Sequence, residues 1–252
     1  MSTGFLGAGD VFIEKFDPAT AAWLPAVGPY ETSKLEIKMN SDLKEQTSKR
    51  KATYGQTTTS VALPKPADFS IEFAQVDAET LQMALMAEAT TINQASGTVA
   101  DEVVVAKVGA WVKLAHDNVA GTGVVVKNSA GTTTYDKDVD YEINYRLGML
   151  RALKDSDIAD LASLKVSYGY NAVTGTLLSG AKVNQIKIRI TMDGVNFADN
   201  LPAVLKVHQA VLSPDTAFDF LSNDFGKVGL KGRMETPAGK SEPFTVAMHD
   251  TV

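Results

Sequence analysis

The 252-residue chain contains no cysteine, which excludes a disulfide framework and any cysteine-ligated metal site. It has no Asn-x-Ser/Thr acceptor site, and no apolar run approaches the roughly 20 residues that a membrane-spanning helix needs. Its first ten residues lack the basic start and apolar centre of a secretory signal. We therefore expect a protein that is made in a reducing cytoplasm, is not inserted into a membrane and is stabilised by packing.

Positive charge is also scarce, because 24 Lys and Arg stand against 30 Asp and Glu, for a net charge of −6. This balance argues against a nucleic-acid reader that works by neutralising phosphates. The charge is unevenly distributed. Residues 1–92 hold 12 acidic and 8 basic side chains, whereas residues 41–56 alone hold two acidic and four basic ones. A locally basic segment therefore lies within an acidic part of the chain.

Apolar and polar residues alternate with the period of two that is typical of half-buried strands. The alternation is clear at residues 34–39, where it places Met39 inside, and again at residues 69–73 and 186–192. Short strand candidates follow one another through residues 103–170 at the spacing of a small sandwich or barrel. We predict a mainly β protein in which residues 1–92 and 181–252 share one core and residues 93–180 form an inserted, sandwich-like all-β domain.

Turn and cap residues refine this prediction. Asp77 is a candidate N-cap for a helix over residues 78–88, and Ser213-Pro214 predicts a second short helix over residues 216–221. Pro64 and Pro66 separate two predicted strands. Asp193-Gly194 predicts a hairpin turn, and residues 228–234 and 244–248 predict a final hairpin.

No motif for catalysis or cofactor binding is found, since the chain has no G-x-S-x-G elbow, P-loop or paired-carboxylate motif. Asp136, Asp138 and Asp140 have the spacing of the first ligands of a calcium loop, but Tyr141 stands where that loop needs glycine. A solvated turn is the preferred interpretation. The three histidines are widely scattered: His116, His208 and His249. We therefore expect a protein that is not an enzyme and has no metal or cofactor.

Residues 40–60, NSDLKEQTSKRKATYGQTTTS, form a long polar segment between two strand-like stretches. The segment has too few apolar side chains to offset its ordering entropy, so in an isolated chain we expect a mobile loop. Such a loop either is a solvated loop without a function or becomes ordered against a partner. In the second case its basic residues Lys49, Arg50 and Lys51 would meet acidic groups on another copy of the chain.

The pattern of the outer 165 or so residues resembles the tail tube proteins, or major tail proteins, of tailed bacteriophages. The resemblance rests on these features in order: GAGDVFI at residues 7–13, the polar loop, FSIEF at 69–73 before an Asp-capped helix, IKIRI at 186–190, LSP at 212–214 and the strand at 225–234. Within the insertion, residues 131–168 resemble a β module that recurs in phage tail proteins.

The resemblance implies a tail-tube-type β-sandwich or barrel with one flanking helix, and an inserted domain on the tube exterior. Members of this family form rings, typically of six subunits, which stack into a hollow tube for DNA delivery. Their long loop reaches the adjacent ring. The corresponding candidates here are Asp42, Lys44, Glu45, Lys49, Arg50, Lys51 and Tyr54. The implied partners are further copies of the chain and the tape-measure, terminator and tail-tip proteins, in a virion tail assembled in the host cytoplasm.

DNA would pass through the tube without specific binding, since a basic wall would hold phosphates and an acidic one lets them slide. Glu36 and Glu72, which point outward from strands with buried opposite faces, are the candidates for the lumen. Two alternatives stay open. One is the tube protein of a contractile injection system, and the other is a carbohydrate-binding β module of a tail tip. The second would act through surface aromatics: Trp23, Trp111, Tyr135 or Tyr141.

Overall fold

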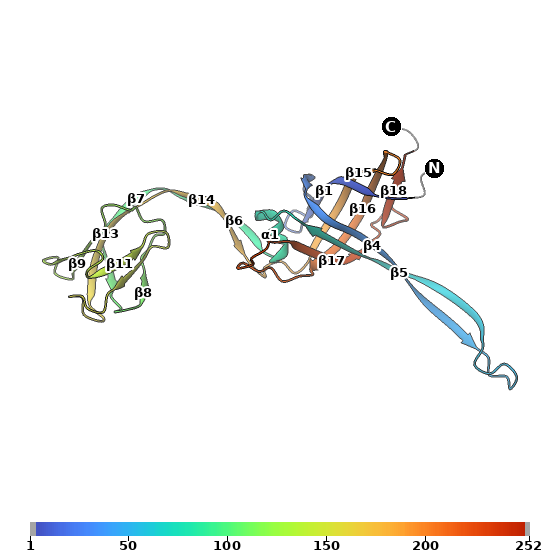
Figure 1. Ribbon diagram of the computed structural model, residues 1–252, viewed down its shortest axis with the longest axis horizontal. Coiled ribbons are helices and arrows are strands. Elements are labelled where there is room, and N and C mark those ends of the chain that lie inside the picture. The colour runs from blue at the N-terminus through green and yellow to red at the C-terminus, as the bar shows by residue number, and fades with distance from the viewer. Residues whose placement is uncertain (1–3, 250–252) are drawn as a thin grey trace. The chain divides into compact units, whose positions relative to one another are not determined.

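The computed structural model describes residues 4–249 and is mainly β, which confirms the predicted fold class. The chain divides into two compact units: unit 1 consists of residues 4–89 and 178–249, and unit 2 of residues 90–177 (Figure 1). These bounds lie within three residues of the expected domain limits. Among the described residues, no helix has the length and apolar character needed to cross a membrane.

Unit 1 is built on one nine-stranded antiparallel sheet with the order β2-β1-β15-β16-β17-β5-β4, in which β3 also pairs with β1 and β18 with β16. Its elements are β1 (Gly7–Asp17), β2 (Ala22–Trp23), β3 (Val27–Tyr30), β4 (Thr32–Thr47), β5 (Thr57–Phe73), α1 (Ala78–Ala84), β15 (Ile186–Asn196), β16 (Leu201–Pro214), β17 (Val228–Met234) and β18 (Phe244–Met248).

The sheet of unit 1 curls so that the inner faces of its strands share one core. The apolar side chains of the alternating segments point into this core, as the period of two predicts. Tyr30 of β3 meets Phe73 of β5 edge to face, with ring centroids 5.6 Å apart, although these strands lie far apart in the strand order. The largest fully buried side chains here are Ile13, Phe69, Ile71, Phe73, Ile188, Ile190, Leu212 and Leu230.

Helix α1 begins where Asp77 predicts. The Asp77 carboxylate accepts a hydrogen bond from the Thr80 N–H at 2.8 Å, and the Asp77 N–H donates to the Thr80 hydroxyl at 2.9 Å. This reciprocal cap satisfies two backbone groups at the helix start. The helix ends at Ala84, four residues before the predicted end, because the chain turns through Leu85 and Met86 into β6 (Glu88–Gln94).

Unit 2 consists of two antiparallel sheets around a separate core, and both chain crossings between the units lie in the two-stranded sheet of β6 and β14. One sheet has the order β10-β9-β13-β7 and the other β11-β12-β8. The strands are β7 (Gly97–Val105), β8 (Trp111–Lys113), β9 (Val125–Asn128), β10 (Thr134–Tyr135), β11 (Tyr141–Asn144), β12 (Met149–Ala152), β13 (Ser163–Tyr170) and β14 (Val173–Ser179).

The helix predicted at residues 216–221 is wrong, because residues 215–227 form an irregular loop between β16 and β17. Pro214 belongs to β16 and pairs with Leu230, so the backbone is still extended where that helix would begin. Within the loop, the Asp219 carboxylate accepts a hydrogen bond from the Leu221 N–H at 2.9 Å. Such local side-chain bonds favour turns over helix.

Both predicted late hairpins also need correction. Asp193 and Gly194 do not form a turn; they lie inside β15, where they pair with β1 on one side and β16 on the other, and the chain reverses at residues 197–200 instead. β17 and β18 do not pair with each other. Each pairs with a different part of β16, at residues 210–214 and 203–207, because β16 is long enough to hold both.

The two separate cores predict separable effects of core truncation. Phe73→Ala should lower the unfolding free energy of unit 1 by about 3–5 kcal/mol, and Leu150→Ala that of unit 2 by about 2–5 kcal/mol. The chain has two tryptophans, Trp23 in unit 1 and Trp111 in unit 2. In a Trp111→Phe background, tryptophan fluorescence during a urea titration therefore reports on unit 1 alone. In a Trp23→Phe background it reports on unit 2 alone. Equal shifts of both probes by either mutation would contradict the two-core description.

Candidate functional site

The polar segment predicted to be a loop is the outer part of a long β-hairpin, which we call the arm (residues 40–65). β4 and β5 stay paired from Asn40 opposite Lys65 to Thr47 opposite Thr57, so only residues 48–56 form the turn. The prediction of a loop without regular structure was wrong because antiparallel pairing satisfies backbone groups without any apolar period. Figure 1 shows the arm running out from the sheet of unit 1.

Pro64 and Pro66 do not separate two strands, contrary to the prediction from the sequence. β5 continues through Pro64 and Pro66, and the register with β4 shifts between Lys38 and Asn40. β17 pairs with β5 only from Asp68 onward, so both prolines lie where β5 has a free edge, and Pro66 falls within the shift. Proline is tolerated in such edge and bulge positions because no ladder bond is lost there.

The arm leaves apolar side chains in solvent on both of its faces. Met39, just before the arm, is 65% exposed, in contrast to the predicted inside position. Leu43 is exposed on one face, while Val61 and Leu63, whose cross-strand partners are Lys44 and Asp42, are exposed on the other. The arm therefore buries neither face against the body of unit 1. A monomer rarely keeps contiguous exposed apolar surface unless the surface meets a partner.

The tip of the arm is held together by its own hydrogen bonds. The Ser48 N–H donates to the Gln56 carbonyl at 2.8 Å, and the Gly55 N–H donates to the Ser48 carbonyl at 2.9 Å. The Ser48 hydroxyl bonds the Thr53 hydroxyl at 2.7 Å. Gly55 has φ +85°, a left-handed conformation that glycine adopts without steric cost. The tip is thus a defined turn that presents its remaining side chains outward.

The predicted loop residues occupy two different settings on the arm. Asp42 lies on β4, where its carboxylate pairs with Lys44 at 3.1 Å and Lys65 at 3.6 Å, and the exposed Glu45 follows on the same strand. The other four candidates lie on the turn and are exposed: Lys49, Arg50, Lys51 and Tyr54. The three turn cations form no ion pair with any residue among 4–249. The tip is therefore an uncompensated positive surface.

Glu36 and Glu72, the candidates for the lumen, lie on one outward face of β4, β5 and β17, which we call the ion-pair face. Glu36 pairs with Lys34 at 2.5 Å, and this bond lowers the pKa of Glu36. Glu72 accepts a hydrogen bond from the Ser33 hydroxyl at 2.6 Å and pairs with Lys227 at 3.0 Å, which together lower its pKa.

The ion-pair face is close to electrically balanced. Asp68 pairs with Arg233, and Asp215 pairs with Lys231. The whole face carries these carboxylates and cations: Glu36, Asp68, Glu72 and Asp215 against Lys34, Lys38, Lys227, Lys231 and Arg233. In a single copy it is therefore not the strongly acidic surface that we expected from the composition of residues 1–92.

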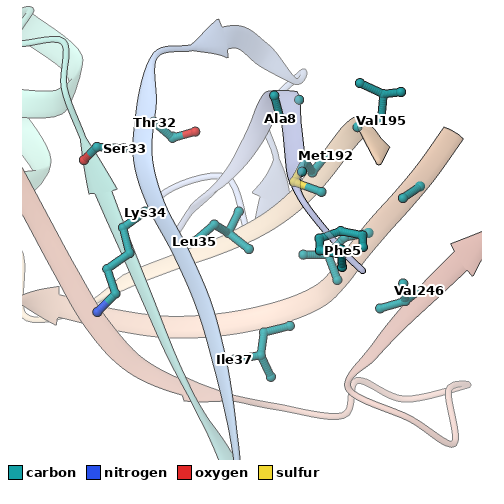
Figure 2. A pocket seen from close by; sticks show the side chains of 15 residues that line it. Phe5, Ala8, Thr32, Ser33, Lys34, Leu35, Ile37, Met192, Val195 and Val246 are labelled. Carbon is teal, nitrogen blue, oxygen red and sulfur yellow. The ribbon is translucent and has the colours of Figure 1, made fainter. Parts of the chain in front are cut away.

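An apolar hollow of about 410 Å³ lies where the two ends of the curled sheet approach without pairing. Figure 2 shows Leu35 and Ile37 of β4 across from Phe5, Met192 and Val246. The lining is mainly apolar and includes no set of convergent titratable groups. Such a hollow can accept an apolar side chain, but it offers no arrangement for acid–base or nucleophilic chemistry.

The hollow has a floor of bare backbone. Gly9 of β1 and Gly194 of β15 are cross-strand partners, and a Cβ added to Gly9 would lie 2.6 Å from the Asp193 carbonyl oxygen. No side chain fits at this position without displacing backbone. Gly9 therefore allows the close packing of β1 on β15.

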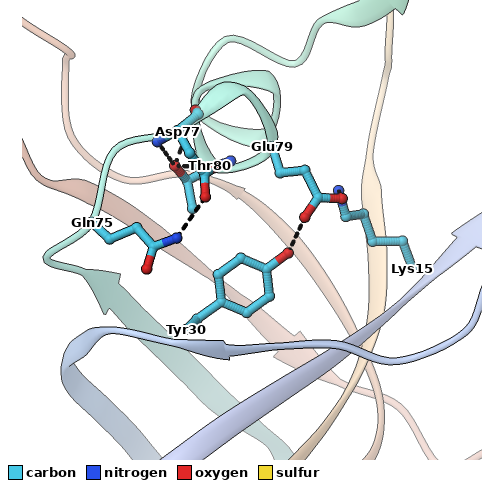
Figure 3. A network of polar contacts seen from close by, with 6 residues as sticks. All are labelled: Lys15, Tyr30, Gln75, Asp77, Glu79 and Thr80. Atoms are coloured by element: carbon cyan, nitrogen blue, oxygen red, sulfur yellow. Dashed lines mark hydrogen bonds and ion pairs between the residues drawn. The ribbon is translucent and has the colours of Figure 1, made fainter.

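A polar network links the sheet to the helix (Figure 3). Glu79 of α1 accepts a hydrogen bond from the Tyr30 hydroxyl and pairs with Lys15 at 2.9 Å. Burial raises the pKa of Glu79, but the bonds from Tyr30 and Lys15 outweigh it, so that the pKa lies below its ordinary value. Burial and the same carboxylate raise the pKa of Tyr30. The network is a structural tie between β1, β3 and α1.

The four aromatic residues proposed for carbohydrate binding are divided between the two units. Trp23 belongs to unit 1, where the Arg189 guanidinium lies 4.0 Å from its ring centroid, while the others belong to unit 2. Trp111 faces Arg151 at 4.8 Å, Tyr135 is half-buried and Tyr141 is buried. Each of these rings is engaged in packing or in a cation contact within its own unit.

The acidic run at residues 136–140 forms a tight turn. The Asp140 carboxylate accepts hydrogen bonds from the Asp136 N–H at 2.9 Å and the Asp157 N–H at 3.1 Å. Both oxygens of this carboxylate thus accept hydrogen bonds from backbone N–H groups. Within residues 4–249, no group of three or more His, Cys, Asp or Glu side chains is placed to hold a metal ion.

Residues 4–242 match the family described as Protein of unknown function UCP028589. The chain belongs to this family. No curated protein matches the chain. The description of this family names no activity.

The Tyr30–Glu79–Lys15 network predicts a pH-dependent contribution to stability. The pKa of Glu79 is lower in the folded than in the unfolded chain, so its contribution is present above the unfolded value near 4.5 and is lost as the pH falls through the folded value. Glu79→Gln should therefore lower the unfolding free energy by about 1 kcal/mol at pH 7, since the carboxylate is partly exposed. As the pH falls below 4.5 and through the lower folded pKa of Glu79, the difference from the unmodified protein should shrink toward zero.

Urea titrations of unit 1 at pH 7 and pH 3 measure this effect. Glu88→Gln is a matched control, because Glu88 is exposed and forms no ion pair with any residue that the structure describes. A Glu79→Gln deficit that is the same at both pH values would show that the carboxylate charge contributes nothing.

Proposed function

We propose that the chain is a non-enzymatic structural protein that assembles with copies of itself into stacked rings, forming a tail tube of the phage type through which DNA passes. The observation that carries this proposal is the arm. It is a regular hairpin, continuous with the body of unit 1, that exposes apolar side chains on both faces and cations at its tip. These features suit a segment that is buried against another subunit.

The sheet edge of unit 1 supports the same proposal. β4 ends the strand order and pairs only with β5, so the other edge of this 16-residue strand has free backbone groups. A long unpaired edge is a template for pairing with another chain. In a ring, each subunit would add its β4 edge to the sheet of a neighbour, and the joined sheets would form the wall of the channel.

The ion-pair face suits a channel wall that DNA passes without being held. Its carboxylates are each matched by a nearby cation, so the wall presents little net positive charge to phosphates. Weak net charge gives little counterion release and hence little non-specific affinity. Glu36 and Glu72 are the residues that we assign to this wall.

Unit 2 has its own core and is inserted through a two-stranded link, so ring formation does not require its surfaces. We assign it to the tube exterior, with the tape-measure, terminator and tail-tip proteins as partners at the tube ends. The same architecture would serve the tube of a contractile injection machine. A sheath gene adjacent to that of this protein would favour this alternative.

Removal of the arm is the direct test of the proposed function. Leu43 and Ala62 are cross-strand partners, so an Asn-Gly turn can replace residues 44–61 without changing the register of the remaining hairpin. The shortened protein should keep the circular dichroism spectrum and thermal midpoint of the body, because the removed residues contribute little to its core. It should form no tubes in negative-stain micrographs, whereas the unmodified protein at the same concentration should form rings and tubes.

Tubes of normal length formed by the shortened protein would contradict a role for the arm. If the unmodified protein stays monomeric at every concentration that its solubility allows, the proposal of a tube protein fails altogether.

Charge reversal on the ion-pair face tests the assignment of the lumen. Glu36→Lys/Glu72→Lys removes two carboxylates and adds two cations, so the face changes from near balance to strongly basic. Tubes of this variant should still assemble but should retain DNA, with at least about tenfold more DNA co-sedimenting at low salt and less at high salt. Asp155→Lys/Asp157→Lys makes the same charge change on exposed positions of unit 2 and is the control. Equal DNA retention by both variants would remove the assignment.

A further inference from the structure

The loop between β16 and β17 (residues 215–227) exposes an unusual amount of apolar surface. Phe218 packs against the core of unit 1 and anchors the loop. In contrast, Phe220 is 68% exposed, Leu221 91% and Phe225 98%. Large aromatic side chains that are held almost entirely in solvent are typical anchors of protein interfaces. We call this segment the aromatic loop.

The aromatic loop also carries uncompensated negative charge. Asp215 at its start pairs with Lys231, and Lys227 at its end pairs with Glu72. Asp219 and Asp224, between these ends, form no ion pair with any residue from 4 to 249 and are exposed. The loop is thus acidic and aromatic, whereas the arm tip carries three unpaired cations and Tyr54, which is 77% exposed.

The arm tip and the aromatic loop lie at opposite ends of the same strand. β5 leaves the tip at Thr57 and ends at Phe73, whose partner on β17 is Val228, the first residue after the loop. A strand of 17 residues spans about 55 Å. The two surfaces therefore cannot meet within one copy. Figure 1 shows the arm and the start of β17 at opposite ends of unit 1.

We propose that the aromatic loop of one copy is the docking surface for the arm tip of the next copy. This inference rests on the proposed function, and it names the receiving surface. Lys49, Arg50 and Lys51 pair with Asp219 and Asp224, while Tyr54 packs on Phe220 and Phe225. Arginine can also stack on an exposed aromatic ring, which adds to the ion pair.

The head-to-tail direction of the contact determines the geometry of the assembly. A contact between two different surfaces at opposite ends of one subunit is heterologous, so each copy has one free tip and one free loop. Such a contact repeats without limit along the axis of the strand. It therefore joins rings end to end and gives every ring the same direction in the tube.

Unit 1 has a second acidic and apolar region, so the proposal has to distinguish between two candidate docking surfaces for the arm tip. Asp10 and Asp193 are exposed cross-strand partners with no ion pair in the described part of the chain, and the exposed Phe197 follows on the chain from β15. β16 runs parallel to β5, since both strands are antiparallel to β17. Because β5 starts at the arm tip, the start of β16 at Leu201 also lies toward that tip. The end of β15 pairs with Leu201 and therefore lies at the same end of unit 1. This region is at the wrong end of unit 1 for end-to-end contact.

Charge reversal with rescue tests the inference on the full-length protein. Lys49→Glu/Arg50→Glu/Lys51→Glu and Asp219→Lys/Asp224→Lys should each raise the concentration needed for tubes at least about tenfold, because like charges then face each other. Combining the two sets should restore tubes to near the original concentration. Combining the arm set with Asp10→Lys/Asp193→Lys should not. Thermal unfolding of each variant checks that its fold is intact.

The absence of cysteine allows a second, independent readout. Lys51→Cys/Phe225→Cys in one chain should give an oxidised ladder of covalent multimers, because a head-to-tail contact links each copy to two others. Lys51→Cys alone and Phe225→Cys alone should give no ladder. Lys51→Cys/Asp10→Cys is the control for the second acidic region.

The outcomes separate this inference from the proposed function. If the unmodified protein forms tubes but the combined charge reversal does not restore them and no ladder appears, the aromatic loop is not the receiver, and the tube proposal stands. Rescue by Asp10→Lys/Asp193→Lys would move the docking surface to that region. If the unmodified protein forms neither rings nor tubes, both proposals fall.

Discussion

The antiparallel ladder between β4 and β5 is the constraint on which the rest of the structure depends. Over its inner half, Phe69, Ile71 and Phe73 anchor β5 in the core of unit 1. Over its outer half, the same hydrogen-bond pattern continues without burial and carries the arm into solvent. A hairpin of two strands alone is marginal in water, so the arm depends on continuity with the buried half.

Charge is arranged differently on the body and at the two ends of β5. On the ion-pair face the carboxylates each have a cation within 4.0 Å, which leaves that surface near neutrality. No ion pair within residues 4–249 is formed by Asp219 and Asp224 of the aromatic loop or by the three arm-tip cations, Lys49, Arg50 and Lys51. Exposed ion pairs contribute little to stability, so their placement bears more on what the surfaces attract than on folding. The ion-pair face is thus nearly neutral, whereas the arm tip is basic and the middle of the aromatic loop is acidic.

The inserted unit extends the chain without disturbing this arrangement. β6 and β14 form a two-stranded link, and both cores are closed by residues of their own unit. An insertion of this kind is tolerated because the entropic cost of a longer connection grows slowly with length. It can therefore carry a separate interaction surface without altering the β4–β5 ladder.

The sequence alone determined the features that depend on local pattern. Alternation of period two placed the buried faces of β15 and β5, Asp77 marked the helix start, and the change of composition near residue 90 marked the insertion. The tertiary structure decided which strands pair. Residues 41–47 became a strand because residues 57–64 of β5 lie opposite them, and a polar sequence cannot indicate such a partner. For the same reason, β18 joined β16 instead of β17, and residues 215–227 became a loop with exposed aromatic side chains. Strand pairing is non-local, and a polar strand carries little information about its partner, so these choices are made only when the whole sheet forms.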